Sequence, residues 1–206
     1  IMLKKTLEEF SIASSTKDPV PGGGGVSALV GSLAASLAEM VTNLTTGKKR
    51  YQEYEEEIQQ IMAQAEVLRK DLLECILKDA EAFEPLAKAY SMDKNAEGYR
   101  EAMEKCLKDA ATPPYLILKY CTDVITLDER LAVIGSKIAV SDVATSVMLA
   151  HGALYGGYIN VKVNTRLMHD REYAEQLDAE VAQLLQEYSA RAVKCYENVM
   201  ERLTNG

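Results

Sequence analysis

Four consecutive glycines at positions 22 to 25, directly after Pro19-Val-Pro21, constrain this chain more than any other stretch. Glycine has no Cβ atom, so this segment can adopt backbone conformations that are closed to other residues. The residues that follow, up to Ala38, carry no charge, and small side chains recur among them at helical spacing. The sequence therefore predicts a loop that opens onto a helix, which another backbone can approach closely.

The glycine segment has two interpretations. In the first it is a flexible linker before a packed core helix, because glycine-rich loops are common. In the second, the uncapped N–H groups at the start of the helix bind an anion or a polar ligand. Nucleotide-binding templates do not fit: Thr42 stands where a Walker A motif needs its first glycine, and Ser27 where the dinucleotide fingerprint needs its third.

Length and composition favour one soluble domain over residues 1–206, which is long enough for a large core. A net charge of −8 argues against nonspecific binding of nucleic acid. The four cysteines form no C-x-x-C pair, which fits a reduced, cytoplasmic protein. The start lacks the apolar core of a signal peptide, and the uncharged stretches are weakly hydrophobic for membrane spans. We expect neither a membrane nor a nucleic-acid partner.

No segment alternates apolar and polar residues for long, so the predicted fold class is all-α. We expect a bundle of long antiparallel helices around the Gly/Ala-rich segment. The near-heptad stripe of the last helix suits antiparallel packing or the seam of a homodimer. We expect a break at Thr112-Pro113-Pro114, a weak point at Gly156-Gly157, and helix caps at Asn95, Ser136 and Asp170. The predicted helices span about 6–15, 25–45, 52–90, 95–111, 114–134, 136–157 and 170–203.

Two aspartates fall on the apolar stripes of their predicted helices. Asp79 lies between Ile76 and Phe83, and Asp142 follows Ile138 by one turn. A carboxylate on a buried stripe must be hydrogen-bonded, ion-paired or protonated, because an isolated buried charge is too costly. In a shared pocket the two can divide general acid and general base roles. Alternatively, each caps a neighbouring helix end or pairs with a buried lysine.

Basic and amide side chains supply further candidate ligand groups. Lys48 and Lys49 can bind substrate carboxylates, or they can complement the dipole at the end of the preceding helix. Asn160 and Asn164 are four residues apart, so in a helix both amides face one way and can hydrogen-bond a flat heterocycle. A tight turn is the alternative for them. His151 has no cysteine or carboxylate at metal-ligand spacing, so we expect no metal.

Taken together, these motifs resemble the cyclodeaminase/cyclohydrolase family, which comprises the C-terminal domain of formiminotransferase-cyclodeaminase and its stand-alone bacterial relatives. The stretch Pro21-Gly-Gly-Gly-Gly-Val-Ser-Ala28, with Gly47-Lys-Lys-Arg-Tyr51 downstream, carries most of the likeness. Further matches are Lys78-Asp-Ala-Glu-Ala-Phe83, Ser141-Asp-Val143 and Asn160-Val-Lys-Val-Asn164. The likeness covers essentially the whole chain, in the right order.

The resemblance implies a dimeric, all-α enzyme that acts on a folate without a metal or a further cofactor. A cyclodeaminase closes 5-formiminotetrahydrofolate to 5,10-methenyltetrahydrofolate and releases ammonia. A cyclohydrolase interconverts 5,10-methenyl- and 10-formyltetrahydrofolate with water. We expect the first reaction, with the second as the alternative. A helical dimer that binds a small anion or a partner protein without catalysis is a third possibility. A formiminotransferase is the implied functional partner.

The resemblance also implies roles for particular residues. Asp79 and Asp142 are the expected acid/base and cation-stabilising pair, and which does which stays open. The glycine loop is expected to lie against the pteridine or its linker, and the basic cluster to meet the carboxylates of one or more glutamates. The expected substrate-binding residues are Gly22, Gly23, Gly24, Gly25, Ser27, Lys48, Lys49, Ser141, Asn160 and Asn164.

Overall fold

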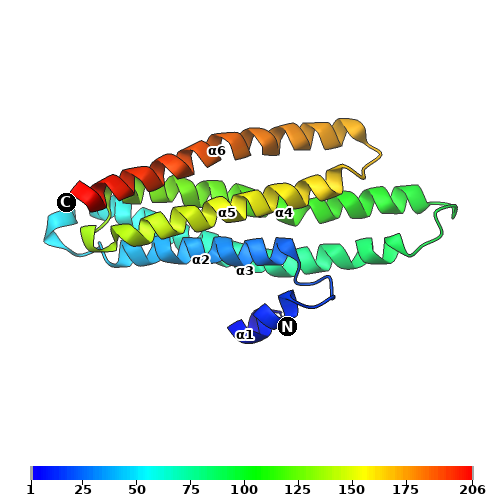
Figure 1. The fold of residues 1–206 in the computed structure, drawn as a ribbon, viewed down its shortest axis with the longest axis horizontal. Coiled ribbons are helices and arrows are strands. Elements are labelled where there is room, and N and C mark those ends of the chain that lie inside the picture. The colour runs from blue at the N-terminus through cyan, green and yellow to red at the C-terminus, as the bar shows by residue number, and fades with distance from the viewer. Residues whose placement is uncertain (1, 206) are drawn as a thin grey trace.

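The computed structural model describes residues 2–205, and throughout these residues the regular structure is helical, as predicted. Five long helices run along one axis, and a short helix lies beside them near the N-terminus (Figure 1). The α-helices are α1 (Leu7–Ser14), α2 (Gly23–Asn43), α3 (Glu55–Tyr90), α4 (Tyr99–Ile134), α5 (Val140–Thr165) and α6 (Arg171–Asn205). Short 3₁₀ segments are η1 (Met2–Lys4), η2 (Lys49–Tyr54) and η3 (Lys137–Ala139).

Helix α2 packs against α3, α4 and α5 through glycine and alanine. A Cβ atom on Gly31 would lie 3.1 Å from Leu72 of α3 and 3.2 Å from the Cys121 sulfur of α4. The small residues therefore permit the close approach that the sequence predicts. The other side of α2 is open, so within one chain this helix is enclosed on one side rather than all round.

Two predicted helix starts are confirmed by their capping bonds. Thr6 precedes α1, and its hydroxyl accepts from the Glu9 amide at 3.2 Å while the Glu9 carboxylate accepts from the Thr6 amide at 2.7 Å. Asp170 precedes α6, and its carboxylate accepts from the Tyr173 amide at 3.1 Å. Both arrangements satisfy N–H groups that have no partner inside the helix.

The predicted break at Thr112-Pro113-Pro114 is wrong, because α4 runs through it without interruption. Pro114 has no N–H, so the Ala110 carbonyl loses its usual donor within the helix. Asn164 of α5 replaces that donor, since its Nδ2 atom donates to the Ala110 carbonyl at 3.3 Å. Gly157 lets α5 approach closely here, because a Cβ atom on it would lie 2.9 Å from the Pro114 oxygen.

Three smaller predictions also fail. Helix α4 begins after Gly98, whose φ of +77° is the left-handed conformation, and not at Asn95. Helix α5 continues through Gly156-Gly157 to Thr165, because packing on α4 outweighs the low helix propensity of glycine. Ser136 precedes η3, but its hydroxyl makes no capping bond.

An uncharged face formed by α2 and α5 is left open. On α5 the exposed residues recur at helical spacing: Ser141, Thr145, Met148, Gly152, Tyr155, Ile159 and Val163. On α2 the exposed apolar residues are Val26, Leu33 and Met40, and Leu44 follows as its C-cap. By length and composition, α2 and the η3–α5 segment could each cross a membrane, and half of each apolar window is buried inside the bundle. Core helices of a soluble protein have the same properties.

Candidate functional site

One group of predicted site residues gathers at the start of α2, which we call the glycine end. Helix α3 brings Asp79 there, and α5 brings Asn160. A Cβ atom on Gly24 would lie 2.6 Å from the Asp79 carboxyl carbon, and one on Gly23 would lie 3.3 Å from Asn160 Nδ2. The distance at Gly24 is too short for any residue with a side chain, and the distance at Gly23 would require Asn160 to shift by a few tenths of an ångström. Glycine at these two positions therefore allows a carboxylate and an amide to reach the helix start.

Asp79 has the electrostatics of an acid/base group. Its side chain is half-buried, and within residues 2–205 it forms no ion pair. Burial raises the pKa of its carboxyl above the usual range, and a hydrogen bond from the Gly25 backbone acts in the opposite direction. The neighbouring Lys78 pairs instead with Glu74, at 3.2 Å. Asp79 is thus available to exchange a proton with a ligand.

The helix start itself offers unused donors. Gly22 is the N-cap of α2 and has no side chain to accept from this end, while the Gly25 amide donates to Asp79. The first hydrogen bond of the helix runs from Val26 N to the Gly22 carbonyl. The amides of Gly23 and Gly24 therefore have no acceptor within α2, and the helix dipole adds partial positive charge there. A polar or anionic group beside Asp79 would meet these donors.

Ser27 and the two asparagines complete the glycine end. The Ser27 hydroxyl donates to the Gly23 carbonyl at 2.6 Å, and its side chain fills the space left by Gly156, where a Cβ atom would lie 2.8 Å from Ser27 Cβ. Asn160 and Asn164 both lie on α5, so the helical interpretation is confirmed and the tight turn is wrong. Their Nδ2 atoms donate to carbonyls one turn back, at 2.8 and 2.9 Å.

The other predicted residues lie at the far end of α2, which we call the basic end: Lys48, Lys49, Ser141 and Asp142. Both lysines are exposed and, with Gly47, line a cavity of about 340 Å³. The Lys48 ammonium lies 3.4 Å from the hydroxyl of the buried Ser136, to which it donates. The two lysine ammonium groups at the edge of this cavity, which Glu55 also lines, suit a carboxylate ligand.

The predicted burial of Asp142 among apolar residues is wrong. Ile138, one turn before it, is 75% exposed, and Thr145 is also exposed. The stripe that carries Asp142 is the open face of α5 and not its core face. Asp142 itself is half-buried in the first turn of α5, where a carboxylate complements the helix dipole.

A pocket shared by Asp79 and Asp142 within one chain is also wrong. Gly24 contacts Asp79, and ten residues further along α2 the Ala34 carbonyl accepts from Ser146 of α5. Asp142 lies one turn beyond Ser146. At 1.5 Å per residue, the two carboxylates are about 20 Å apart along the bundle. One chain thus separates the glycine end from the basic end.

Tyr51 is a residue at the basic end that the sequence analysis did not assign to the site. Its hydroxyl accepts from the Lys137 amide at 3.0 Å and so ties η2 to η3. This hydrogen bond lowers the pKa of Tyr51, and Ser136, Arg50 and Lys48 act in the same direction. Its place in the G-K-K-x-Y motif is the sequence signal that could have assigned Tyr51 to the site.

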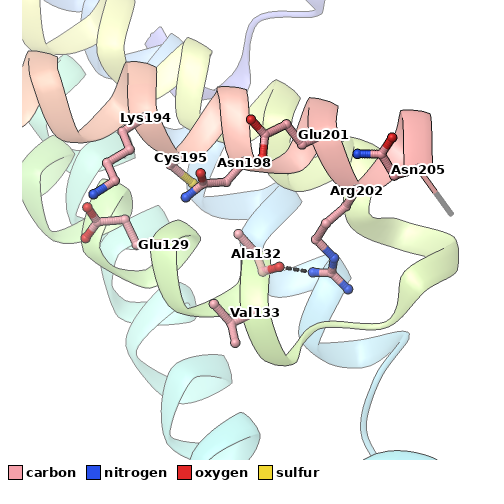
Figure 2. Close-up of a pocket in the computed structure, with 9 residues that line it drawn as sticks. All are labelled: Glu129, Ala132, Val133, Lys194, Cys195, Asn198, Glu201, Arg202 and Asn205. Carbon is pink, nitrogen blue, oxygen red and sulfur yellow. Dashed lines mark hydrogen bonds between the residues drawn. The ribbon is translucent and has the colours of Figure 1, made fainter.

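Another cavity lies between α4 and the C-terminal half of α6 (Figure 2). It measures about 710 Å³ and contains none of the predicted site residues. The Arg202 guanidinium donates to the Ala132 carbonyl at its edge. Between residues 2 and 205 no cluster of three or more His, Cys, Asp or Glu side chains could hold a metal ion. The absence of a metal from the reaction stays a prediction.

Comparison with known proteins identifies the family. A sequence profile described as formiminotransferase-cyclodeaminase matches residues 6–183. The chain belongs to the formiminotransferase-cyclodeaminase family. It is 35% identical over 203 residues to a methenyltetrahydrofolate cyclohydrolase from Methylorubrum extorquens, covering 97% of this chain and 98% of that one. It is 25% identical over 195 residues to the formimidoyltransferase-cyclodeaminase of Mus musculus, covering 93% of this chain but 36% of that protein.

A solved structure of the family has the same fold. The crystal structure of formiminotetrahydrofolate cyclodeaminase from Thermotoga maritima matches with a TM-score of 0.84 and 33% identity, covering 100% of this chain and 98% of that one. The resemblance inferred from the glycine loop and the G-K-K-x-Y motif is thereby confirmed. The two relatives of matching length carry the names of two different enzymes, at similar identity.

Proposed function

We propose that this chain is an enzyme of folate one-carbon metabolism that acts on the N5–N10 bridge of a tetrahydrofolate. The observation that carries the proposal is the Asp79 carboxyl packed against Gly24 and the free amides of α2. A half-buried acid whose pKa is raised by burial can both accept and return a proton. The full-length likeness to two enzymes named for tetrahydrofolate substrates supplies the substrate class.

The first candidate reaction is that of a formimidoyltetrahydrofolate cyclodeaminase. N10 attacks the carbon of the protonated formimino group on N5 and gives a tetrahedral centre, from which ammonia departs to leave the cationic 5,10-methenyl bridge. Asp79 would accept the N10 proton and return a proton to the departing nitrogen, so one carboxyl serves both steps. The methenyl product is a cation, and a second carboxylate such as Asp142 would stabilise it.

The second candidate is the methenyltetrahydrofolate cyclohydrolase, which the 35% identical relative of matching length favours. Water attacks the methenyl carbon, and ring opening leaves a formyl group on N10. Asp79 would then take one proton from the attacking water and deliver it to N5, while the second water proton is released to solvent as the formyl C=O forms. The same arrangement of residues fits this reaction, so the substrate decides between the two. A third reading, a non-catalytic helical dimer, predicts no turnover with either folate.

The activity test is an assay of the purified protein with each folate. With 5-formiminotetrahydrofolate, a cyclodeaminase releases ammonia while methenyl absorbance appears at the same rate. With methenyltetrahydrofolate, a cyclohydrolase consumes that absorbance and forms 10-formyltetrahydrofolate. Chelator treatment should leave either rate unchanged, because the proposal needs no metal. Failure of both assays would overturn the enzymatic proposal and favour the non-catalytic dimer.

The substrate contacts follow from the two ends of α2. The amides and the bare backbone of Gly22 to Gly25, with Ser27, Asn160 and Asn164, would contact the pteridine or its linker. Lys48 and Lys49 would meet glutamate carboxylates, which suits a polyglutamylated folate, and Ser141 would lie beside Asp142. A formiminotransferase would supply the 5-formimino substrate, and we infer a cytoplasmic setting without membrane or nucleic acid.

We also infer a homodimer, formed through the open face of α2 and α5. This face is uncharged over most of its length and holds Leu33, which is 46% exposed, at its middle. Val26 and Met40 lie seven residues to either side of Leu33. A two-fold axis near Leu33 would therefore pair Val26 with the partner's Met40, as an isologous interface requires. Gly152 of α5 has open space beside it, which leaves room for a partner backbone.

Such a dimer brings separated residues together. With antiparallel α2 helices, the glycine end of one chain lies opposite the basic end of its partner. Asp79 would then share a site with the partner's Asp142 and the partner's Lys48. This arrangement removes the 20 Å gap, estimated from the helix rise, that separates the two ends in one chain.

Sedimentation analysis of Leu33→Glu tests the dimer. A charge buried at the centre of the interface should convert the dimer to a folded monomer, because burying an unpaired carboxylate is costly. Leu7→Glu is the matched control, since Leu7 is exposed on α1 and belongs to neither α2 nor α5. A wild-type monomer, or a dimer that both variants leave intact, would contradict this interface.

A further inference from the structure

Asp128 of α4 lies in the interior of the bundle, and its side chain is fully buried. The site described above does not use it. Ser146 of α5 is also fully buried, and its hydroxyl oxygen lies 2.7 Å from Asp128 Oδ2. The same hydroxyl oxygen lies 2.8 Å from the Ala34 carbonyl oxygen of α2. These three residues join α4, α5 and α2 in one hydrogen-bonded chain.

The number of hydrogen atoms in this hydrogen-bond network determines whether Asp128 is protonated or ionised. The Ser146 hydroxyl carries one hydrogen and can donate it to one acceptor. An ionised Asp128 and the Ala34 carbonyl are both acceptors, so with an ionised acid one of the two contacts would lack a hydrogen. A neutral Asp128 resolves this, because its O–H donates to Ser146 and Ser146 donates to Ala34.

The surroundings of Asp128 also favour the neutral acid. Its Oδ1 atom has no hydrogen-bond partner in the described part of the chain. The adjacent Glu129 is a like charge, and it pairs with Arg191 of α6 at 2.6 Å. The other titratable group facing Asp128 from α6 is the buried Cys195 thiol, while α5 and α2 contribute Ser146 and Ala34. Burial raises the pKa of Asp128 well above its usual range.

We propose that Asp128 is a neutral carboxylic acid that acts as a proton-held clamp between α4, α5 and α2. The clamp fixes the register of α5 on α2, and this register also brings Gly156 against Ser27 and Asn160 against Gly23. Asp128 is therefore a positioning residue for the glycine end. When it ionises, Ser146 turns its hydrogen to the carboxylate and its bond to Ala34 is lost.

The clamp makes stability depend on pH in a defined direction. In the unfolded chain Asp128 ionises at the ordinary aspartate pKa, while in the folded chain it stays protonated to higher pH. Between these two values the folded state binds more protons, so stability falls as pH rises. Below both pKa values Asp128 is protonated in the folded and the unfolded chain, so it adds no pH dependence. Above both pKa values the loss of stability from its ionisation is constant.

Asp128→Asn is the test, because the amide keeps the donor to Ser146 and cannot ionise. Unfolding by urea is followed from pH 4.5 to 8.5 for both proteins. The unfolding constant of the wild type, divided by that of Asp128→Asn, should rise with pH by up to about tenfold per unit and then level off. Asp109→Asn is the control, since Asp109 is exposed on the same helix. Its unfolding constant should change with pH as that of the wild type does.

A flat ratio, or an Asp128→Asn variant that is less stable at every pH or fails to fold, would overturn the clamp, because the amide preserves both hydrogen bonds. Infrared spectra of the wild type with ¹³C-labelled aspartate give a second test without changing Asp128. A protonated carboxyl band should persist above the ordinary aspartate pKa of about 4 and shift in Ser146→Ala. Its absence would mean that Asp128 is ionised. Neither measurement depends on the proposed reaction.

Discussion

Among single residues, Gly24 has a strict steric limit that involves the proposed acid/base group, because a Cβ atom there would overlap the Asp79 carboxyl. We expect Gly24→Ala to push Asp79 away from the helix start and to lower kcat on the order of a hundredfold, as misplacement of a reacting group by about 1 Å can. Gly152→Ala is the matched control. Gly152 also lies in a helix, but nothing lies within 4 Å of its Cβ position.

Steady-state kinetics and thermal unfolding of both glycine variants check this expectation. Gly24→Ala should lose turnover while it keeps a cooperative unfolding transition. Because Gly152 faces the proposed interface, its variant should be compared as a confirmed dimer. Equal activity of Gly24→Ala and the wild type would mean that the contact with Asp79 has no role in the reaction.

The pH dependence of the reaction reports on Asp79 directly. Its pKa is raised by burial, and an ionised carboxyl is needed to accept the proton from N10 or from water. As pH falls through this raised pKa, kcat/KM should fall, with a midpoint above the ordinary aspartate value of about 4. The residual activity of Asp79→Asn should lack this acid limb. If the limb persists unchanged in that variant, another group is the base.

The sequence predicted the desolvation of Asp79 correctly and the burial of Asp142 incorrectly, for a physical reason. An apolar stripe indicates a surface that avoids water, but it does not say whether the cover is the same chain or a second one. Asp79 lies on a stripe covered by α2 of its own chain, so its desolvation follows from the pattern. The stripe of Asp142 is open in a single chain, and Ile138 is mostly exposed.

Within the helices, the substitute donor at Pro114 gives a stability prediction. Asn164→Ala leaves the Ala110 carbonyl without a partner, which should lower the free energy of unfolding by about 1 to 2 kcal/mol. In a Pro114→Ala background the helix regains its own N–H donor at this position, so Asn164→Ala should cost less there. Urea unfolding of the two single variants and the double variant measures this coupling. Additive effects would mean that the amide does not replace the missing donor.

Helix boundaries could be predicted where local chemistry decides them. Thr6 and Asp170 cap helices through side-chain bonds within three residues, and Gly135 ends α4 as expected. At Pro114 the decisive contact comes from Asn164, which lies 50 residues away in the chain. A local sequence pattern cannot indicate a contact with so distant a residue, so the predicted break was wrong.

In the whole molecule, the all-α class follows from the absence of alternating patterns, and the family from motifs spread over the full length. The sequence could not predict that the site residues divide between two ends of one helix. That division depends on the register of α5 on α2, which Ser146 and Gly156 set through tertiary contacts. The proposed dimer is the simplest way to reunite Asp79 with Asp142.

Mixing two inactive variants tests this composite site most directly. In a heterodimer of Asp79→Asn and Asp142→Asn, one site keeps both acids and the other has neither. Random exchange should therefore restore about a quarter of the wild-type sites, as expected for a two-fold dimer. Asp79→Asn mixed with Asn160→Ala is the control, because both changes lie at the glycine end and every site keeps a defect. Recovery of folate turnover in the first mixture alone is the predicted result, and no recovery in either would contradict a site shared across the dimer.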